Sequence, residues 1–211
     1  MLSARGLSKK YGDFTAVFPV SLDLREGETV ILAGPNGSGK STLLSMMAFA
    51  LKPDEGQVDA DGLPPKEARK RIAYAPQEIT LFEELSTIEN LKAWSSLSKA
   101  ESIARAEELI EALDMEQFRK KRVGKLSGGQ RRRVNLAAAL MCHPQYILLD
   151  EPLAGIDPDG SEKILALLRK EREKGAALLV TEHVMRDLIT FADRMITLSG
   201  GRIVSEEDLR G

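Results

Sequence analysis

The sequence has a single cysteine, Cys142, among 211 residues. One cysteine cannot form an intramolecular disulfide or a zinc site built from several cysteines, which fits a reducing compartment. The longest apolar run, Leu136–Cys142, is far shorter than the roughly 20 residues that a membrane-spanning helix needs. No apolar signal-peptide core follows Met1. We therefore expect a cytoplasmic protein whose membrane role, if it has one, comes through a partner.

Neither sign of charge dominates the sequence. The chain has 30 Lys and Arg residues against 32 Asp and Glu residues, which gives a formal net charge of −2. Without an overall basic field we expect no nucleic-acid partner. The basic runs Arg119–Arg122 and Arg131–Arg133 are typical of solvated faces, and the alternative is attraction to phosphates or to anionic lipid. A chain of 211 residues suffices for one sizeable core, with room for a smaller subdomain.

Strand patterns and helix patterns alternate along much of the chain. β-branched and aromatic residues over 2–32 predict strands interrupted at Gly12–Asp13 and Glu26–Gly27. Glu, Lys, Leu and Ala at helical spacing predict a helical insert over 87–143, with Leu109, Ile110 and Leu113 on one stripe. Further helices are predicted over 40–50 and 159–173, and further strands over Thr29–Ala33, Tyr146–Leu149, Ala176–Thr181, Arg194–Leu198 and Arg202–Ser205. The alternation indicates an α/β fold with a parallel sheet.

A glycine-rich loop follows the short apolar strand at Thr29–Ala33. It matches the pattern G-x-x-x-x-G-K-[ST] with Gly34, Pro35, Asn36, Gly37, Ser38, Gly39, Lys40, Ser41 and Thr42. Glycines let the backbone wrap closely around a polyphosphate, with amides pointing inward and the N-terminus of the next helix behind them. Lys40 is expected to reach the β- and γ-phosphates, and Ser41 to ligate Mg²⁺. The alternative is an ordinary glycine-rich turn, which the flanking strand and helix disfavour.

Two carboxylates end the apolar strand at Tyr146–Leu149. Open parallel sheets bind ligands at the carboxyl ends of their strands, so Asp150 lies beside the glycine-rich loop if the two strands are neighbours. Its carboxylate then suits Mg²⁺, directly or through water. Glu151 becomes the general base, or the group that orients the attacking water. Taken alone, the pair is also typical of a solvated strand end, and the glycine-rich loop favours the functional interpretation.

The segment Leu126-Ser127-Gly128-Gly129-Gln130 resembles the signature of the ABC ATPases. The order of the motifs is also similar to that family: the loop at 34–42, Gln77, the signature, the acid pair and then His183. The resemblance covers nearly the whole chain. It implies a single ABC ATPase domain over 1–211 with a P-loop NTPase fold. That fold has a mixed sheet core, an antiparallel β subdomain and an α-helical subdomain over approximately 78–143.

The resemblance assigns roles to individual residues. Tyr11 matches the aromatic residue that stacks on adenine, while Val17 either packs near the ribose or belongs to the core. Gln77 resembles the glutamine that touches Mg²⁺ and the attacking water. His183 resembles the switch histidine that contacts the γ-phosphate. ATP and Mg²⁺ are the implied cofactors.

The signature also implies a partner subunit. In the family, the helix N-terminus that corresponds to Ser127, Gly128, Gly129 and Gln130 faces the γ-phosphate of ATP held by the other protomer. That helix is predicted to continue through Cys142. One chain with one loop and one signature cannot complete either site, so a second ATPase subunit is implied and a homodimer is favoured. Ala154-Gly155-Ile156-Asp157 resembles the loop that crosses to this partner.

The segment from Ala75 to Leu91 indicates the kind of machine. It resembles a run common in ATPase subunits of drug, antibiotic and polysaccharide-like exporters. This implies an integral membrane permease subunit as a further partner, and a peripheral location on the inner face of the cell membrane. Leu81, Phe82 and Leu85 either contact the permease or anchor the helical insert. The alternative is a soluble ABC ATPase that works in cofactor assembly without a membrane partner.

Overall fold

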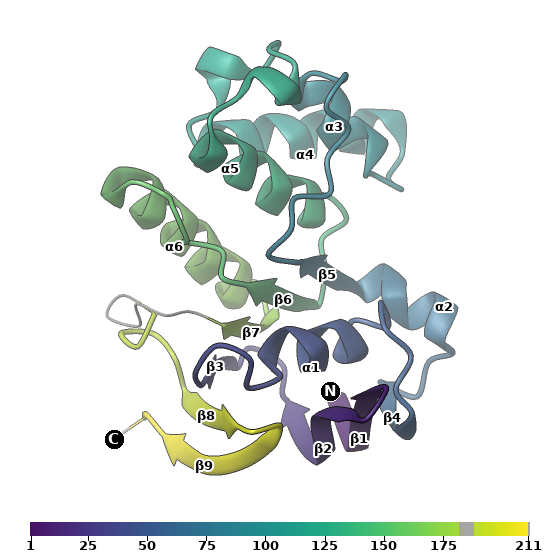
Figure 1. Cartoon of the computed structure of the whole chain (residues 1–211). Helices are drawn as coiled ribbons and strands as arrows, with labels where there is room; N and C mark the ends of the chain where they lie inside the picture. Colours follow the sequence, from purple (N-terminus) through teal and green to yellow (C-terminus); the bar gives the residue numbers. More distant parts are fainter. Residues whose placement is uncertain (182–187, 211) are drawn as a thin grey trace.

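Two β-sheets pack around one helix. The computed structural model of the chain describes residues 1–181 and 188–210. Within them, β1 (Leu2–Tyr11), β2 (Phe14–Leu24) and β4 (Glu55–Ala60) form an antiparallel sheet in the order β2-β1-β4. Helix α1 (Lys40–Met47) packs between this sheet and the larger one (Figure 1).

The larger sheet has six strands in the order β5-β6-β7-β3-β8-β9. They are β5 (Ile72–Ala75), β6 (Tyr146–Asp150), β7 (Ala177–Thr181), β3 (Thr29–Ala33), β8 (Arg194–Ser199) and β9 (Arg202–Asp208). All paired strands are parallel except β8 and β9, so the sheet is mixed. Strand β7 lies between β3 and β6. The condition under which Asp150 was expected beside the glycine-rich loop, that β3 and β6 are neighbours, is therefore not met.

Both faces of the larger sheet are buried at β6, β7 and β3, and side chains alternate between the two faces along each strand. Ile31 and Ala33 belong to a first core beneath α4 (Lys99–Ala112), α5 (Gly128–Ala139) and α6 (Pro158–Glu173). Val30 and Leu32 belong to a second core shared with α1 and the antiparallel sheet. Such continuous apolar strands are expected when other elements cover both faces of a parallel sheet.

The helical insert forms one end of the molecule. Figure 1 shows α3 (Thr87–Ala93), α4 and α5 gathered at the end far from β8 and β9. Short 3₁₀ turns at Glu116–Phe118 and Val123–Lys125 connect α4 to α5. Leu109, Ile110 and Leu113, the predicted stripe, are all buried. Among the described helices, none has the length and apolar character that crossing a bilayer requires.

A buried ion pair fastens the helical end to α6. Arg105 of α4 is only 2% exposed, and its Nη2 donates to Glu171 Oε1 of α6 at 3.0 Å. The same guanidinium donates to the carbonyl of Leu140 just after α5 and to Glu108 Oε2 at 2.6 Å. Burial alone would raise the pKa of Glu108, but hydrogen bonds from Arg105 and Lys170 outweigh burial and lower the pKa to about 2. One side chain thus joins three helices.

Two strands and two helix ends differ from the sequence-based expectation. Strand β4 has Val58 and Ala60 as its only apolar side chains and lies at a sheet edge, mostly exposed, so it shows no strand pattern. Strand β5 is only four residues long, and it comes directly after α2 (Pro65–Ala68) and a 3₁₀ turn at Arg69–Arg71. Helix α1 ends at Met47 rather than at residue 50, and Phe49 beyond it has φ +54. Helix α5 ends at Ala139 and does not reach Cys142.

Candidate functional site

A cavity of about 440 Å³ opens where the hairpin, the glycine-rich loop and the acid pair meet. Small-molecule sites commonly fall between about 300 and 1,000 Å³. The residues that line it come from the β1–β2 hairpin, from the loop and the start of α1, and from the ends of two strands: Tyr11, Phe14, Ala16, Asn36, Gly37, Gly39, Lys40, Ser41, Thr42, Gln77 and Glu151. The fold therefore brings together residues from four separate parts of the sequence.

Two glycines let the loop run close to other backbone. Gly34 has φ +143, and a Cβ atom there would lie 2.0 Å from the carbonyl oxygen of Leu198. Gly39 has φ +101, and a Cβ atom there would lie 2.5 Å from the carbonyl oxygen of Ala16. A side chain at either position would push the backbone apart. Strands β8 and β2 thus hold the loop at the start of α1.

The loop fits a polyphosphate. Helix α1 begins without a side-chain cap at Gly39, which leaves its first amides for an anion. The Ser38 hydroxyl is buried and has no hydrogen-bond partner in the part of the chain that the structure describes. Lys40 is 6% exposed, and its Nζ donates to the carbonyls of Gly34 at 2.8 Å and Pro35 at 3.1 Å. An unpaired hydroxyl, uncapped amides and an ammonium group therefore converge on the loop.

Thr181 at the end of β7 holds the acid pair at the end of β6. Its Oγ1 donates to Asp150 Oδ1 at 2.6 Å and accepts from the Glu151 amide at 3.0 Å. Glu151 has φ +52, in the left-handed region. For a non-glycine residue this conformation costs on the order of 1–3 kcal/mol and persists only where surrounding contacts enforce it. Thr181 was not a candidate from the sequence, although its place at the end of an apolar strand was the available signal.

Gln77 and Glu151 meet at the cavity wall. Gln77 Nε2 donates to Glu151 Oε2 at 3.0 Å, and both side chains line the cavity. Asp150 is 3% exposed and is not among the residues that line the cavity. The charge of Asp150 also acts on Tyr74 of β5. Burial, and then this charge, raise the pKa of Tyr74, whose hydroxyl lies 2.7 Å from the Ser45 hydroxyl of α1.

The donors near the loop fit Mg²⁺. This ion prefers oxygen ligands and is usually held by one or two carboxylates together with substrate phosphates. Ser41 and Gln77, with a hydroxyl and an amide oxygen, line the cavity. Asp150, with a carboxylate, is the last residue of β6 and directly precedes Glu151 of the cavity wall. This set of donors suits an ion that binds together with a nucleotide.

The signature residues lie on a different surface. Ser127 is exposed and caps α5: its Oγ accepts from the Gln130 amide at 3.3 Å, and its amide donates to Gln130 Oε1 at 3.1 Å. Gly129 packs toward the backbone of Gly155, where a Cβ would lie 3.4 Å from the carbonyl oxygen. None of the described residues that line the cavity comes from Ser127, Gly128, Gly129 or Gln130. The two halves of the expected site are apart within one chain.

The β1–β2 hairpin supplies two aromatic rings to the cavity. Tyr11 is 53% exposed and Phe14 is 63% exposed, and both line the cavity. Val17 is fully buried in the second core, which agrees with the core alternative for that residue, and Ala16 lines the cavity in its place. Phe14 was not a candidate from the sequence, because an aromatic residue in a strand is typical of a core. The expected switch residue His183 lies outside the described residues.

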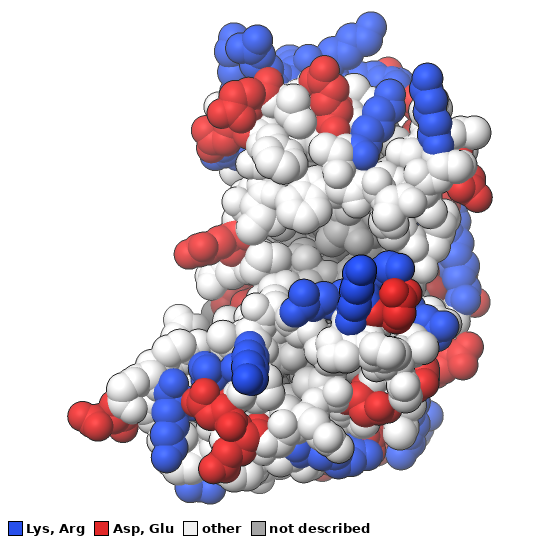
Figure 2. Space-filling view, turned by 90° about the vertical axis from the view of Figure 1, so that its right-hand side faces the viewer, with Lys and Arg blue, Asp and Glu red and all other residues white. Residues whose placement is uncertain are grey.

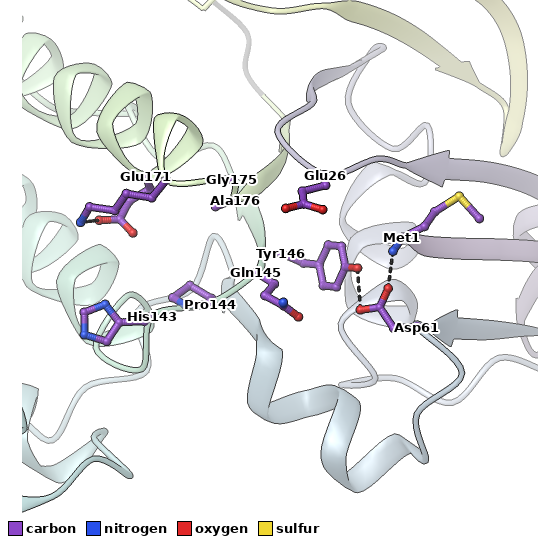
Figure 3. Close-up of a pocket in the computed structure, with 11 residues that line it drawn as sticks. Met1, Glu26, Asp61, His143, Pro144, Gln145, Tyr146, Glu171, Gly175 and Ala176 are labelled. Atoms are coloured by element: carbon purple, nitrogen blue, oxygen red, sulfur yellow. Dashed lines mark hydrogen bonds and ion pairs between the residues drawn. The ribbon is translucent and has the colours of Figure 1, made fainter.

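A second cavity, of about 220 Å³, lies at the opposite end of β6 and β7 (Figure 3). Glu26, Asp61 and Glu171 are among the residues that line it, and the Tyr146 hydroxyl donates to Asp61 Oδ2 at 2.8 Å. Burial and the hydrogen bond to Asp61 raise the pKa of Tyr146. Lys174 also lines this cavity, but none of residues 34–42 does, and its volume is below the usual range for small-molecule sites, so a nucleotide fits the first cavity better.

Comparison with known proteins also indicates an ATP-binding protein. A family model described as ABC transporter matches residues 17–154. The chain belongs to the ABC transporter family. This ABC ATPase is 40% identical to a probable ABC transporter ATP-binding protein of Azorhizobium caulinodans, over 98% of this chain and 77% of that protein. It is 38% identical to the lipopolysaccharide export system ATP-binding protein LptB of Acidithiobacillus ferridurans, over 97% of this chain and 89% of that protein.

Solved structures match the whole fold. A dimeric ATP-binding cassette in a post-hydrolysis state, bound to ADP and Pi, has a TM-score of 0.90 and 34% identity, with 100% of both chains covered. The ATP-binding subunit of an ABC transporter has a TM-score of 0.92 and 27% identity, covering 99% of this chain and 90% of that chain. The predicted ABC-type α/β fold and the ATPase activity are thereby confirmed.

Proposed function

We propose that this ABC ATPase works as a pair of subunits that bind two ATP molecules between them and drive a membrane exporter. The separation of the two half-sites carries the proposal. Lys40 and Glu151 line the cavity, whereas Ser127 is exposed at the start of α5 and does not line it. A second copy of the chain can supply the missing donors, and the dimeric cassette with 34% identity supports this arrangement.

The residues of the cavity have distinct tasks in hydrolysis. Lys40 and the loop amides hold the β- and γ-phosphates. Mg²⁺, when bound by Ser41, Gln77 and Asp150, supplies charge neutralisation at the phosphates. Glu151 accepts a proton from the attacking water, and the Gln77 amide, 3.0 Å away, fixes the position of its carboxylate.

Two further groups complete the site. His183 would hydrogen-bond the γ-phosphate, since a neutral imidazole can donate one hydrogen bond and accept another. Ser127 and Gly129 of the second copy would face the same phosphate with the N-terminus of α5, which favours negative charge. Catalysis then rests on positioning and on preorganised electrostatics, and closure of the two copies completes both sites.

An exposed aromatic pair supports docking to a membrane subunit. Phe82 is 50% exposed and Trp94 is 45% exposed, with ring centroids 6.1 Å apart. Buried Asn90 fixes the loop that carries Phe82, because it accepts from the Phe82 amide at 2.9 Å and donates to the Phe82 and Leu85 carbonyls. Leu81 instead packs against the first core, which supports the anchoring alternative for that residue.

The aromatic pair has charged neighbours, because Glu83 and Glu84 are exposed beside Phe82 and Lys92 is exposed near Trp94. Figure 2 shows a band of uncharged side chains across the waist of the molecule, at the height of the connection from β5 to α3 in Figure 1. Charged side chains of both signs lie above and below the band. The name of the lipopolysaccharide export relative supports export as the direction of transport. A subunit of this kind would lie in the cytoplasm, peripheral on the inner face of the cell membrane.

Replacing Phe82 with Ala is expected to weaken assembly with the membrane subunit by more than about tenfold, since a buried aromatic anchor is a common hot spot. Nucleotide affinity should stay unchanged, because Phe82 does not line the cavity. The measurement is the amount of membrane subunit retained on the tagged ATPase. Ile103→Ala, at a 40% exposed apolar residue of α4, is the matched control. Full retention by the Phe82 variant would show that this aromatic residue does not dock the membrane subunit.

The whole proposal is tested by purifying tagged Glu151→Gln protein from detergent-solubilised native membranes with Mg-ATP. We expect a multi-span membrane chain in fixed ratio to the ATPase, lost in the variant that also carries Phe82→Ala. A bare dimer, or soluble partners alone, would favour the alternative of a soluble ABC ATPase in cofactor assembly.

A further inference from the structure

The β1–β2 hairpin places two aromatic side chains opposite each other. Gly12 and Asp13 form its two-residue turn, with Gly12 at φ +59, as a type II′ turn requires of its first residue. Tyr11 and Phe14 flank the turn and are paired in the strand register. Directly opposed residues of an antiparallel pair project from the same face, with Cβ atoms about 5 Å apart. Both rings therefore belong to one face of the hairpin tip.

The exposure of Phe14 is unusual for its chemistry. Phe118 in the first core is 3% exposed, whereas Phe14 is 63% exposed although it belongs to a long strand. Phe14 lines the nucleotide cavity on one side and an adjoining cavity of about 410 Å³ on another. An apolar ring kept at the rim of a cavity is available to a flat apolar ligand.

The tasks proposed for the other lining residues leave the hairpin residues for the base. Lys40 and the loop supply the groups that fit phosphates, and Gln77 and Glu151 are the pair proposed to position the attacking water. The part lined by Tyr11, Phe14 and Ala16 has aromatic rings and a methyl group instead of charged side chains. Stacking on such rings tolerates any flat base and is worth about 1–3 kcal/mol per base in nucleic-acid complexes.

We infer that Phe14 is a second aromatic contact for the purine base, acting together with Tyr11. This inference rests on the proposed nucleotide site. The two rings form an aromatic corner at the tip of the hairpin: Tyr11 stacks on one face of the base, and Phe14 covers a neighbouring surface. Phe14 is thus a binding residue for the nucleoside part of the substrate and does not touch the phosphates.

The test compares ATP with inorganic tripolyphosphate, which lacks the nucleoside. Phe14→Ala is expected to weaken ATP binding about tenfold in calorimetric titration, from the stacking energy given above. Tripolyphosphate should bind the variant and the unchanged protein equally. Phe14→Trp should keep ATP affinity within about threefold, because it preserves the aromatic surface. Val204→Ala, at a 61% exposed apolar residue of β9, is the control for removal of exposed apolar surface.

The outcomes separate the inference from the proposal beneath it. Unchanged ATP affinity in Phe14→Ala would overturn the inference. An equal loss for ATP and tripolyphosphate would also overturn it, because it would show a distorted loop in place of a lost base contact. Failure of the unchanged protein to bind either compound would instead sink the nucleotide site itself.

Discussion

Glu151→Gln is expected to lower the rate of ATP hydrolysis by at least about 100-fold, the usual range for loss of a general base. The amide has the size of the carboxylate and can still accept from Gln77, so the geometry at the cavity wall is kept. It cannot take a proton from water. ATP affinity should therefore remain, and the closed dimer should accumulate because it no longer empties. Phosphate release and size-exclusion chromatography with Mg-ATP measure the two effects.

Glu162→Gln is the matched control, since Glu162 is an exposed carboxylate on α6 away from the cavity. It should hydrolyse ATP at the normal rate and give no ATP-dependent dimer beyond that of the unchanged protein. If the Glu151 variant also turned over at the normal rate, the base assignment would be wrong, and another group would have to accept the proton.

Arg105→Ala is expected to lower the free energy of unfolding by about 3–5 kcal/mol, because it leaves the buried carboxylate of Glu171 without its main partner. For a chain of this size the melting temperature should fall on the order of 10 °C. Thermal and urea unfolding measure the change. The loss should be largest near neutral pH. Glu108, with a pKa of about 2 in the folded protein, contributes stability above its ordinary pKa and loses it as the pH falls toward 2.

Arg119→Ala separates burial from ion pairing. Arg119 also contacts two carboxylates, Glu107 and Glu116, but these are 46% and 66% exposed. Exposed ion pairs contribute about 0–1 kcal/mol, so this variant should unfold almost as the unchanged protein does. Equal losses in the two variants would show that the position of Arg105 between α4 and α6 has no special weight.

Local chemistry made the glycine-rich loop and the acid pair readable from the sequence. Residues 34–42 carry a pattern in which each residue type has a direct physical task, and Asp150 and Glu151 end a fully apolar strand. The order of strands was not readable. Asp150 was expected beside the loop only if β3 and β6 were neighbours, yet β7 intervenes, and the crossover connections that decide this order leave no mark on the strands themselves.

Features that depend on hydrogen bonding between strands far apart in the sequence could not be predicted either. Strand β4 is held by its hydrogen bonds to β1 and has little apolar character of its own. Thr181 reaches the acid pair only because β7 runs beside β6 in parallel register. The exposure of Phe14 follows from the hairpin turn, whereas its sequence neighbourhood reads as an ordinary strand. The roles assigned to the site residues, including His183, remain predictions.

The backbone at Glu151 has a consequence for how such a chain can evolve or be engineered. At φ +52, glycine would avoid the strain of on the order of 1–3 kcal/mol that glutamate bears, a gain that the larger conformational entropy of glycine in the unfolded chain offsets only in part. Glycine has no carboxylate to accept a proton. A screen for thermal stability alone would therefore favour glycine at this position, in a protein that no longer hydrolyses ATP. Only selection for ATP turnover retains glutamate there, so stability and activity pull this one residue in opposite directions.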